Sequence, residues 1–506
     1  MSLRVAQFLY RWRLLLSALA VLGALILAPR AQIQTIDNDL TAWFATDDPI
    51  YQDYKRFSDE FGGTRTVIVA IEAPTRERLL SAEGFAFLDK VSSDIERVQA
   101  VERVSSLATA TVVDAVPPSG PDDAGGLDVR RLIDDLDTMS PAVVGQRAID
   151  DELFRGDLIS PDGTVTALIL FFDEVRIDDV RAEVLAEIRS LVDSQLPEGF
   201  VAHYNGSLEI SEWYNRVTLS NQTTFTPPIF ILTLGALWFM FRSWRKTLLT
   251  FFTILVSLSW TLGLYDLLGF SYNVLSSMII PLVVVLAVAD DVHILQHYEI
   301  ARRRSSREQA FVTTIRHLMA PLFGASVTTA LGMLSLATSQ VVAVREFGMG
   351  AAVGVMVDFG ISLVLVPTML GWINERSEPA PQETWFLEPL RRVARFSIRH
   401  ATSVIVVAAL LAVVAGFGML RLRVDTNHIN FFSEQHELYK SAQVIDNQLA
   451  GIYTFQVFLE GEPESMQQPD ILKRMDRLSS ALTDLPFIKK VTSVADYVKR
   501  VHREFN

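Results

Sequence analysis

Two adjacent carboxylates stand inside an apolar stretch that is long enough to cross a bilayer. The stretch PLVVVLAVADDVHILQHY, residues 281–298, places Asp290 and Asp291 directly after nine apolar or near-apolar residues. An ionised Asp at the centre of a membrane helix costs on the order of 2.5–3.5 kcal/mol on insertion scales. His293 and His297 follow. At about 100° per residue, both histidines share a helical face with Asp290, while Asp291 points to one side. One carboxylate and two imidazoles on one face could relay protons.

These residues also have structural interpretations. An acid inside the membrane can be paired with Lys, Arg or backbone groups, in which case the Asp pair only supports helix packing. His297 is predicted to lie near the cytosolic boundary of the membrane, where a solvated histidine is ordinary. We therefore keep Asp290, Asp291 and His293 as the predicted relay and His297 as support for it.

A later apolar segment carries a further acid. Asp358 lies near its middle, with Ser362 four residues on, and an acid at that depth marks a proton relay or a substrate path by default. Thr328 and Thr329 could hydrogen-bond Asp290 across helices, although membrane threonines more often bond the carbonyl four residues back. Four glycines are predicted to allow close helix packing: Gly332, Gly348, Gly350 and Gly354.

Composition excludes several classes of protein. The chain has 506 residues, half of them hydrophobic, and its net charge of −14 argues against nucleic acid as a partner. It has no Cys, which excludes disulfides, thiol catalysis and Cys-based metal sites. The polar part has neither a nucleophile–base constellation nor metal-ligand spacing. We therefore predict no catalytic residues, no metal and no cofactor.

Charge and hydropathy define a membrane topology. Residues 30–222 hold 36 acidic and 17 basic residues, while basic clusters fall in short loops such as Arg242–Lys246 and Arg302–Arg307. The positive-inside rule places these loops and the N-terminus in the cytosol. The predicted order is a first transmembrane helix in 1–29, an external domain in 30–222, helices 2–6 in 223–373, a basic cytosolic linker in 374–401, a seventh helix in 402–420 and the start of a second external domain in 421–506.

The first external domain is predicted to be α+β, with ferredoxin-like units. Its strands and helices alternate along the chain, as such units require. The main expected strands are Thr66–Glu72, Val104–Leu107, Thr164–Glu174 and Val201–Asn205, and the main expected helices are Ala82–Val98, Val129–Leu136, Pro141–Ile149 and Asp178–Leu196.

The sequence also contains an internal duplication. Asp37–Glu72 aligns without a gap with Asp425–Glu460, at an offset of 388 residues. A helix precedes each copy, which favours a retained span over a signal peptide at Leu14–Ala28. The second copy stops at Asn506, so we expect an incomplete second repeat, either because the chain is a fragment or because the gene is truncated.

Four motifs in this order resemble the resistance–nodulation–division (RND) superfamily. More closely, the chain resembles its MMPL-type predicted exporters, with the sterol-sensing-like helix block of Patched, Dispatched and the Niemann–Pick sterol carrier. The resemblance covers the whole chain. The motifs are FRSWRKTLL at 241–249, AVADDVHIL at 287–295, SVTTALGMLSL at 326–336 and the glycine-rich helix at 345–370.

The resemblance implies a proton-driven exporter of a hydrophobic or lipidic molecule, with external porter domains. In the family, the fourth-helix Asp takes a proton from outside, and its neutralisation shifts the helices. Here that residue is Asp290 or Asp291, and Asp290 is preferred because it shares a face with His293. The chain departs from the family pattern where Ala287 and Ala289 replace the Gly that often precedes the pair, and its relay partners from a tenth helix lie beyond Asn506.

The predicted location is a bacterial inner membrane, crossed several times, with the N-terminus cytosolic and the large domains periplasmic. The predicted partners are membrane lipids, a hydrophobic substrate and protons. A homo-oligomer or a periplasmic partner protein is left open. The alternative is a sterol-sensing-like lipid receptor or scaffold that does not pump and should not need a titrating carboxylate. A membrane-tethered enzyme has less support, because the external domain shows no catalytic cluster.

Overall fold

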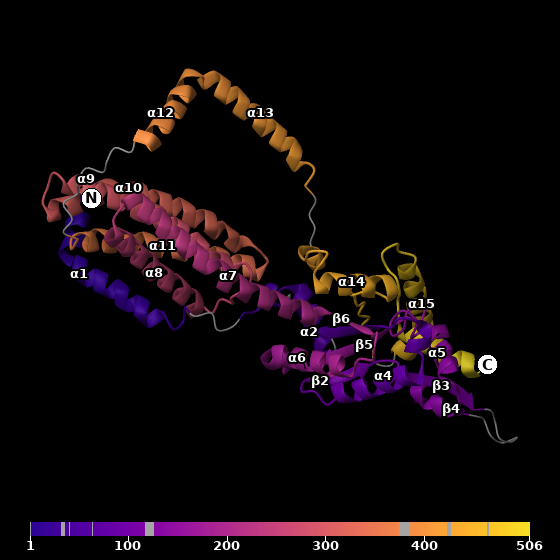
Figure 1. Cartoon of the computed structure of the whole chain (residues 1–506). Helices are drawn as coiled ribbons and strands as arrows, with labels where there is room; N and C mark the ends of the chain where they lie inside the picture. The colour runs from indigo at the N-terminus through magenta and orange to yellow at the C-terminus, as the bar shows by residue number, and fades with distance from the viewer. Residues whose placement is uncertain are drawn as a thin grey trace. The chain divides into compact units, whose positions relative to one another are not determined.

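The computed structural model describes residues 2–31, 36–39, 41–62, 64–116, 126–373, 384–422, 427–462 and 465–505 (Figure 1). Within these residues, seven helices are long and apolar enough to cross a membrane. Each overlaps one of the seven apolar segments expected from the sequence. Their bounds are α1 Ser2–Leu27, α7 Ser207–Phe241, α8 Trp244–Leu267, α9 Ile279–Arg302, α10 Arg307–Leu334, α11 Val342–Leu370 and α13 Ala401–Met419.

The chain divides into two compact units. One holds the apolar helices and is built from residues 1–38, 42–45 and 215–426. The other holds the sheets and is built from residues 39–41, 46–214 and 427–506. The basic linker predicted at 374–401 includes the amphipathic helix α12, Thr384–Arg399, while residues 374–383 lie outside the described residues.

Helix α8 packs against α1, α9 and α11, and α10 packs against α1, α9 and α11. The cores between them are apolar and include Leu249, Ile294 and Phe311. By contrast, α13 buries none of its residues. A helix that exposes apolar side chains in this way is suited to contact lipid.

Glycines set the closest approaches among these helices. A Cβ added at Gly350 would lie 2.4 Å from the Tyr265 ring, one at Gly354 would lie 2.6 Å from Thr261, and one at Gly348 would lie 2.6 Å from Leu336. These three positions confirm the close-packing prediction. The prediction is wrong for Gly332, where an added Cβ meets nothing within 4 Å, because this residue is on the exposed side of α10.

Helix α7 begins earlier than the apolar segment that the sequence predicts. The expected segment starts near Thr223, whereas the helix runs from Ser207 to Phe241 and contains Pro227 and Pro228. Residues 207–222 contain no proline or glycine, so neither residue interrupts the helix before the apolar part.

The larger sheet of the second unit has four antiparallel strands in the order β2–β5–β1–β6. Their bounds are β1 Thr66–Glu72, β2 Val101–Ser105, β5 Val165–Phe172 and β6 Val201–Asn205. Helices α4 (Ala82–Ile95) and α6 (Ile177–Gln195) pack against each other, and their buried side chains share one core with the strands. Phe85 and Phe172 are among the largest side chains in that core, both fully buried.

A second, two-stranded sheet corrects one prediction. Strands β3 (Thr111–Val116) and β4 (Gly126–Arg131) pair, and the 3-10 helix η2 follows at Leu132–Asp137. The helix predicted at Val129–Leu136 is therefore wrong. The pairing is supported by contacts between distant residues: Arg130 bonds Asp114 at 2.6 Å and Asp135 at 2.7 Å, and Arg147 of α5 (Pro141–Asp150) also pairs with both acids.

This ionic cluster predicts a local dependence on acid. Partial burial acts to raise the pKa of Asp114, but hydrogen bonds from Arg130 and Arg147 outweigh it and lower that pKa. A carboxyl whose pKa is lowered on folding contributes stability above its unfolded pKa, near 4, and loses it as pH falls through the folded pKa. We expect Asp114→Asn to cost about 1 kcal/mol at neutral pH and to weaken the loss of stability below pH about 4.

Hydrogen exchange in peptides covering β3 and β4 at pH 7 and pH 3 would measure this. The exposed Asp59→Asn serves as the control, and equal acid sensitivity in wild type and Asp114→Asn would contradict the prediction.

One helix from the C-terminal part of the chain packs on the larger sheet. Helix α14 (Glu437–Gln448) covers one face of the sheet, where Ile445 and Leu449 contact a cluster that includes Ile68 and Ala167. The Asn205 amide donates to the Leu438 carbonyl at 3.1 Å. The remaining elements of this unit are α2 Pro49–Phe61, α3 Arg76–Leu79, η1 Thr41–Trp43, η5 His428–Phe431, η6 Ser465–Gln467, α15 Pro469–Thr483 and α16 Val494–Phe505.

Candidate functional site

Two carboxylates from different helices come together in the helical unit. Asp291 of α9 is completely buried, and Asp358 of α11 is 2% exposed. Ser362, one turn after Asp358, donates to its carboxylate at the long distance of 3.5 Å and also interacts with Asp291. The two carboxylates are close enough to act on each other electrostatically. Helix packing thus brings the predicted residues Asp291 and Asp358 into one site.

No cation among the described residues compensates the charge of this site. Among the described residues, neither Asp291 nor Asp358 forms an ion pair, and neither oxygen of Asp291 has a hydrogen-bond partner. An ionised carboxylate in such surroundings is strongly disfavoured, whereas binding a proton removes its charge. The arrangement can therefore hold one proton between two acids, as other close pairs of carboxyl groups do.

The other part of the predicted relay faces outward. Asp290 is half-buried and interacts electrostatically with His293, while His293 and His297 are exposed on the surface of the helical unit. The three residues share one side of α9, as their spacing indicates. Asp290 also acts on both buried acids, so it lies beside the pair.

The two threonines of α10 bond their own helix. Thr328 donates to the carbonyls of Gly324 and Ala325 at 3.0 and 2.9 Å, and Thr329 donates to Ala325 at 2.9 Å. Each hydroxyl satisfies a carbonyl of the preceding turn, which is the common behaviour of membrane threonines. No hydrogen bond from either threonine to Asp290 is present in the described structure.

Sequence reasoning missed the contribution of α8. Ser257 of this helix is fully buried and interacts with Asp358, at a geometry too poor to count as a hydrogen bond. A signal was available, because Thr and Ser recur on α8 at spacings of three and four residues: Thr247, Thr250, Thr253, Ser257 and Thr261. Such spacing places hydroxyls on one face of a helix.

The second unit contains an apolar cavity of about 940 Å³. It lies between the larger sheet, α2 and the segment that follows α14, and aromatic side chains from both parts of the chain line it. Phe57 and Phe61 of α2 make edge-to-face contacts with Phe458 at its wall. Ligand pockets of this size are typically apolar with few polar groups. Other lining residues are Ile169, Phe171, Met475 and Leu482.

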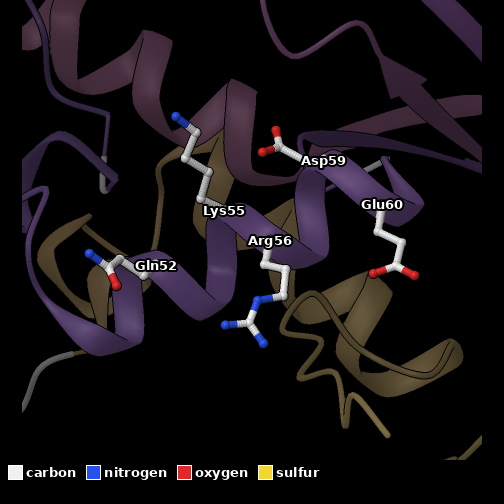
Figure 2. Close-up of a pocket in the computed structure, with 5 residues that line it drawn as sticks. All are labelled: Gln52, Lys55, Arg56, Asp59 and Glu60. Carbon is white, nitrogen blue, oxygen red and sulfur yellow. The ribbon is translucent and has the colours of Figure 1, made fainter. Parts of the chain in front are cut away.

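A second hollow, of about 490 Å³, lies over the outer face of α2. Figure 2 shows its five lining side chains, Gln52, Lys55, Arg56, Asp59 and Glu60, pointing away from the helix. Arg56 pairs with Glu460 at 3.3 Å and with Asp53 at 3.9 Å. Alternating charges of this kind are typical of a solvated helix face, and the five residues include no Ser, Thr, Cys or His.

Comparison with known proteins identifies the family. The sequence model of the MMPL family matches residues 42–400, which is more than half of the chain. The chain belongs to the MMPL family. It is a multi-pass membrane protein, as its apolar helices indicate.

Three described proteins are similar to this chain in sequence. The hopanoid transporter HpnN of Rhodopseudomonas palustris is 27% identical over 209 residues, covering 41% of this chain and 24% of the relative. The multidrug resistance protein MdtC of Salmonella typhi is 26% identical over 215 residues, covering 41% of this chain and 20% of the relative. The putative membrane protein MJ1562 of Methanocaldococcus jannaschii is 18% identical over 329 residues, covering 64% of this chain and 81% of the relative. The match therefore spans about a quarter or less of the two relatives described as a transporter or a resistance protein.

Proposed function

We propose that this MMPL protein is an RND-type exporter driven by the proton gradient. The observation that carries the proposal is the buried pair Asp291–Asp358, which has no cation partner in the described structure. A protonated and an ionised pair favour different helix arrangements, because the two negative charges of the ionised pair repel each other and are stabilised by hydration. Transport follows if the external domain responds to that change. Asp290 and His293, beside the pair, serve as the entry to it.

The substrate in this proposal is hydrophobic or lipidic. Support comes from the aromatic-lined cavity of about 940 Å³ in the external unit. It also comes from a relative described as a hopanoid transporter, since a hopanoid transporter must accommodate a large apolar molecule. An apolar molecule taken from the membrane would leave lipid for a surface of similar polarity, so its transfer into the cavity would be inexpensive.

The proposal includes the architecture and the orientation. The strand order β2–β5–β1–β6, with α4 and α6 as crossovers, supports a ferredoxin-like porter domain. The offset of 388 residues that relates Asp37 to Asp425 also relates the starts of α2 and α14 at Pro49 and Glu437, which supports a duplication. The basic loops support a cytosolic N-terminus and a porter domain on the other side of the membrane. The proposal adds that this membrane is a bacterial inner membrane and that residues 223–373 form a sterol-sensing-like block.

Lipidomics of separated inner and outer membranes tests the proposal. In cells whose gene carries Asp290→Asn with Asp291→Asn, we expect one lipid class to accumulate in the inner membrane. The control is Asp266→Asn, which removes an exposed carboxylate that pairs with Arg30. If the lipid profiles of the double variant and the control both match wild type, lipid export is the wrong function and the receptor alternative gains support.

A further inference from the structure

Helix α8 carries a row of buried hydroxyl groups that its packing does not explain. Thr247, Thr250, Thr253 and Ser257 are completely buried, and Thr261 is 1% exposed. At about 100° per residue, the five side chains fall within an arc of about 120°. A Cβ at Gly354 of α11 would touch both Thr261 and Val283 of α9, so the row faces these two helices.

The five hydroxyls fall into two groups. Thr253 and Thr261 donate to carbonyls of their own helix, at 3.2 Å to Leu249 and 2.8 Å to Ser257. The hydroxyls of Thr247, Thr250 and Ser257 have no hydrogen-bond partner among the described residues. Buried polar groups are nearly always satisfied, so three orphans on one face of one helix call for an explanation.

The three hydroxyls without a partner extend along α8, from the carboxylate pair toward the start of the helix. Ser257 is the last of the three along α8, and it is beside Asp358. The position along α8 that Asp291 faces follows from the apolar contacts before and after it in α9. Ile254 packs with Ala287, and Leu249 packs with Ile294 and Leu295. Because α8 and α9 are consecutive and antiparallel, Asp291 lies between those levels.

Asp291 therefore lies at about the level of Thr250. Thr247 is one turn closer to the start of α8, which begins at Trp244. There Lys246 pairs with Glu299 of α9 at 2.5 Å, at the membrane face that carries the turn between α7 and α8.

We propose that the hydroxyls of Thr250 and Thr247, with bridging water, form a proton path between the Asp291–Asp358 pair and the membrane face at Lys246 and Glu299. This inference rests on the proposed function and adds the route by which the proton leaves. Successive hydroxyls on the row are about 4.5–6 Å apart along the axis, too far for a direct hydrogen bond but suitable for one water between them. An orphan hydroxyl offers that water both a donor and an acceptor.

Each transfer along this path is balanced. A protonated carboxyl gives its proton to a neighbouring water, that water passes one of its own protons to the next hydroxyl oxygen, and the hydroxyl releases its original proton to the following water. The last proton is taken up by bulk water at the membrane face. Each water and hydroxyl on the path is neutral again after the transfer, and the carboxylate is left ionised. The charged groups of α8, α9 and α11 nearest the path are Lys246, Glu299, Asp290, Asp291 and Asp358.

The test compares two kinds of hydroxyl removal on the same face. Thr247→Val with Thr250→Val removes the two orphan hydroxyls. Thr253→Val removes a hydroxyl that is equally buried but already bonded to its own helix. The full chain is reconstituted in lipid vesicles and mixed rapidly into buffer of another pH, while the infrared band of protonated carboxyl groups is followed. Loss of the band in Asp291→Asn and Asp358→Asn assigns it to the pair.

We expect deprotonation of the pair to slow by on the order of tenfold to a hundredfold in the double variant, and to keep its wild-type rate in Thr253→Val. Thr250→Ser in the wild-type chain keeps a hydroxyl at this position and should keep the wild-type rate. The thermal midpoint should change little in the double variant, because valine keeps the shape of threonine and the removed hydroxyls bond no protein group among the described residues. If the double variant does not fold, the single change Thr250→Ala carries the same comparison.

Two failures can be told apart. If the double variant deprotonates as fast as Thr253→Val while Asp291→Asn removes the band, the path is wrong and the proton-binding pair stands. If neither Asp291→Asn nor Asp358→Asn changes the band, the pair does not bind protons, and the proposed function is wrong together with the path.

Discussion

Asp291→Asn is expected to reduce export by on the order of a hundredfold or more, because the amide keeps the shape of the side chain but cannot take up and release a proton. Asp291 is completely buried and shares its site with Asp358. Asp290 is half-buried and faces His293, so Asp290→Asn is expected to cost less than about tenfold. The ratio of the two effects is the quantity of interest, since the sequence alone favours Asp290.

The measurement is the rate at which cells clear the accumulated lipid from the inner membrane after expression of each variant. Asp266→Asn controls for expression, and the thermal midpoint of each purified variant controls for folding. Asn at position 291 should not lower that midpoint, because it replaces a buried acid that has no partner in the described structure. A larger loss at position 290 than at position 291 would reverse the assignment of the proton-binding residue.

Gly354→Val is expected to destabilise the helical unit by about 3 kcal/mol, because the new side chain has no room between α8 and α11. Its Cβ alone would lie 2.6 Å from the Thr261 methyl and 3.3 Å from Val283. The residue is one turn before Asp358, so the displaced backbone also separates the two carboxylates. The recovery of monodisperse protein and the thermal midpoint in one detergent measure the effect.

Gly332→Val is the matched control. Gly332 is a helical glycine in another apolar span, but an added Cβ there meets nothing within 4 Å. We expect this variant to keep the wild-type thermal midpoint. Equal losses in the two valine variants would show that helix flexibility, and not close packing, explains the need for glycine at these positions.

Hydropathy and charge predicted the helical part of the fold well, because a membrane span needs a long apolar segment whatever it packs against. The same reasoning located Asp291 and Asp358 as acids at unusual depth. It did not predict that they meet. Helical spacing shows which residues share a face, but which face turns inward depends on side chains of α8 and α11 that are distant in the sequence.

That limit explains the preference for Asp290. Asp290, His293 and His297 do share one side of α9, but packing turns Asp291 into the core. The missed strand β4 has a similar cause. Arg130 is held by Asp114, which is 16 residues away, and a single-segment pattern cannot detect a partner at that distance. The helix predicted at Pro141–Ile149, which needs only local periodicity, is confirmed as α5.

The length of α7 has a mechanical consequence. Its 35 residues extend about 52 Å, whereas the hydrocarbon core of a bilayer is about 30 Å thick. About 20 Å of this helix therefore extends beyond the hydrocarbon core, as a stalk. Pro227 and Pro228 have no amide hydrogen, so the carbonyls of Thr223 and Thr224 lose their usual helical donors. Bending stiffness is lowest where two such bonds are missing in succession. We expect α7 to bend at Pro227 and Pro228. A shift of the membrane helices would then tilt the polar part of α7, residues 207–222.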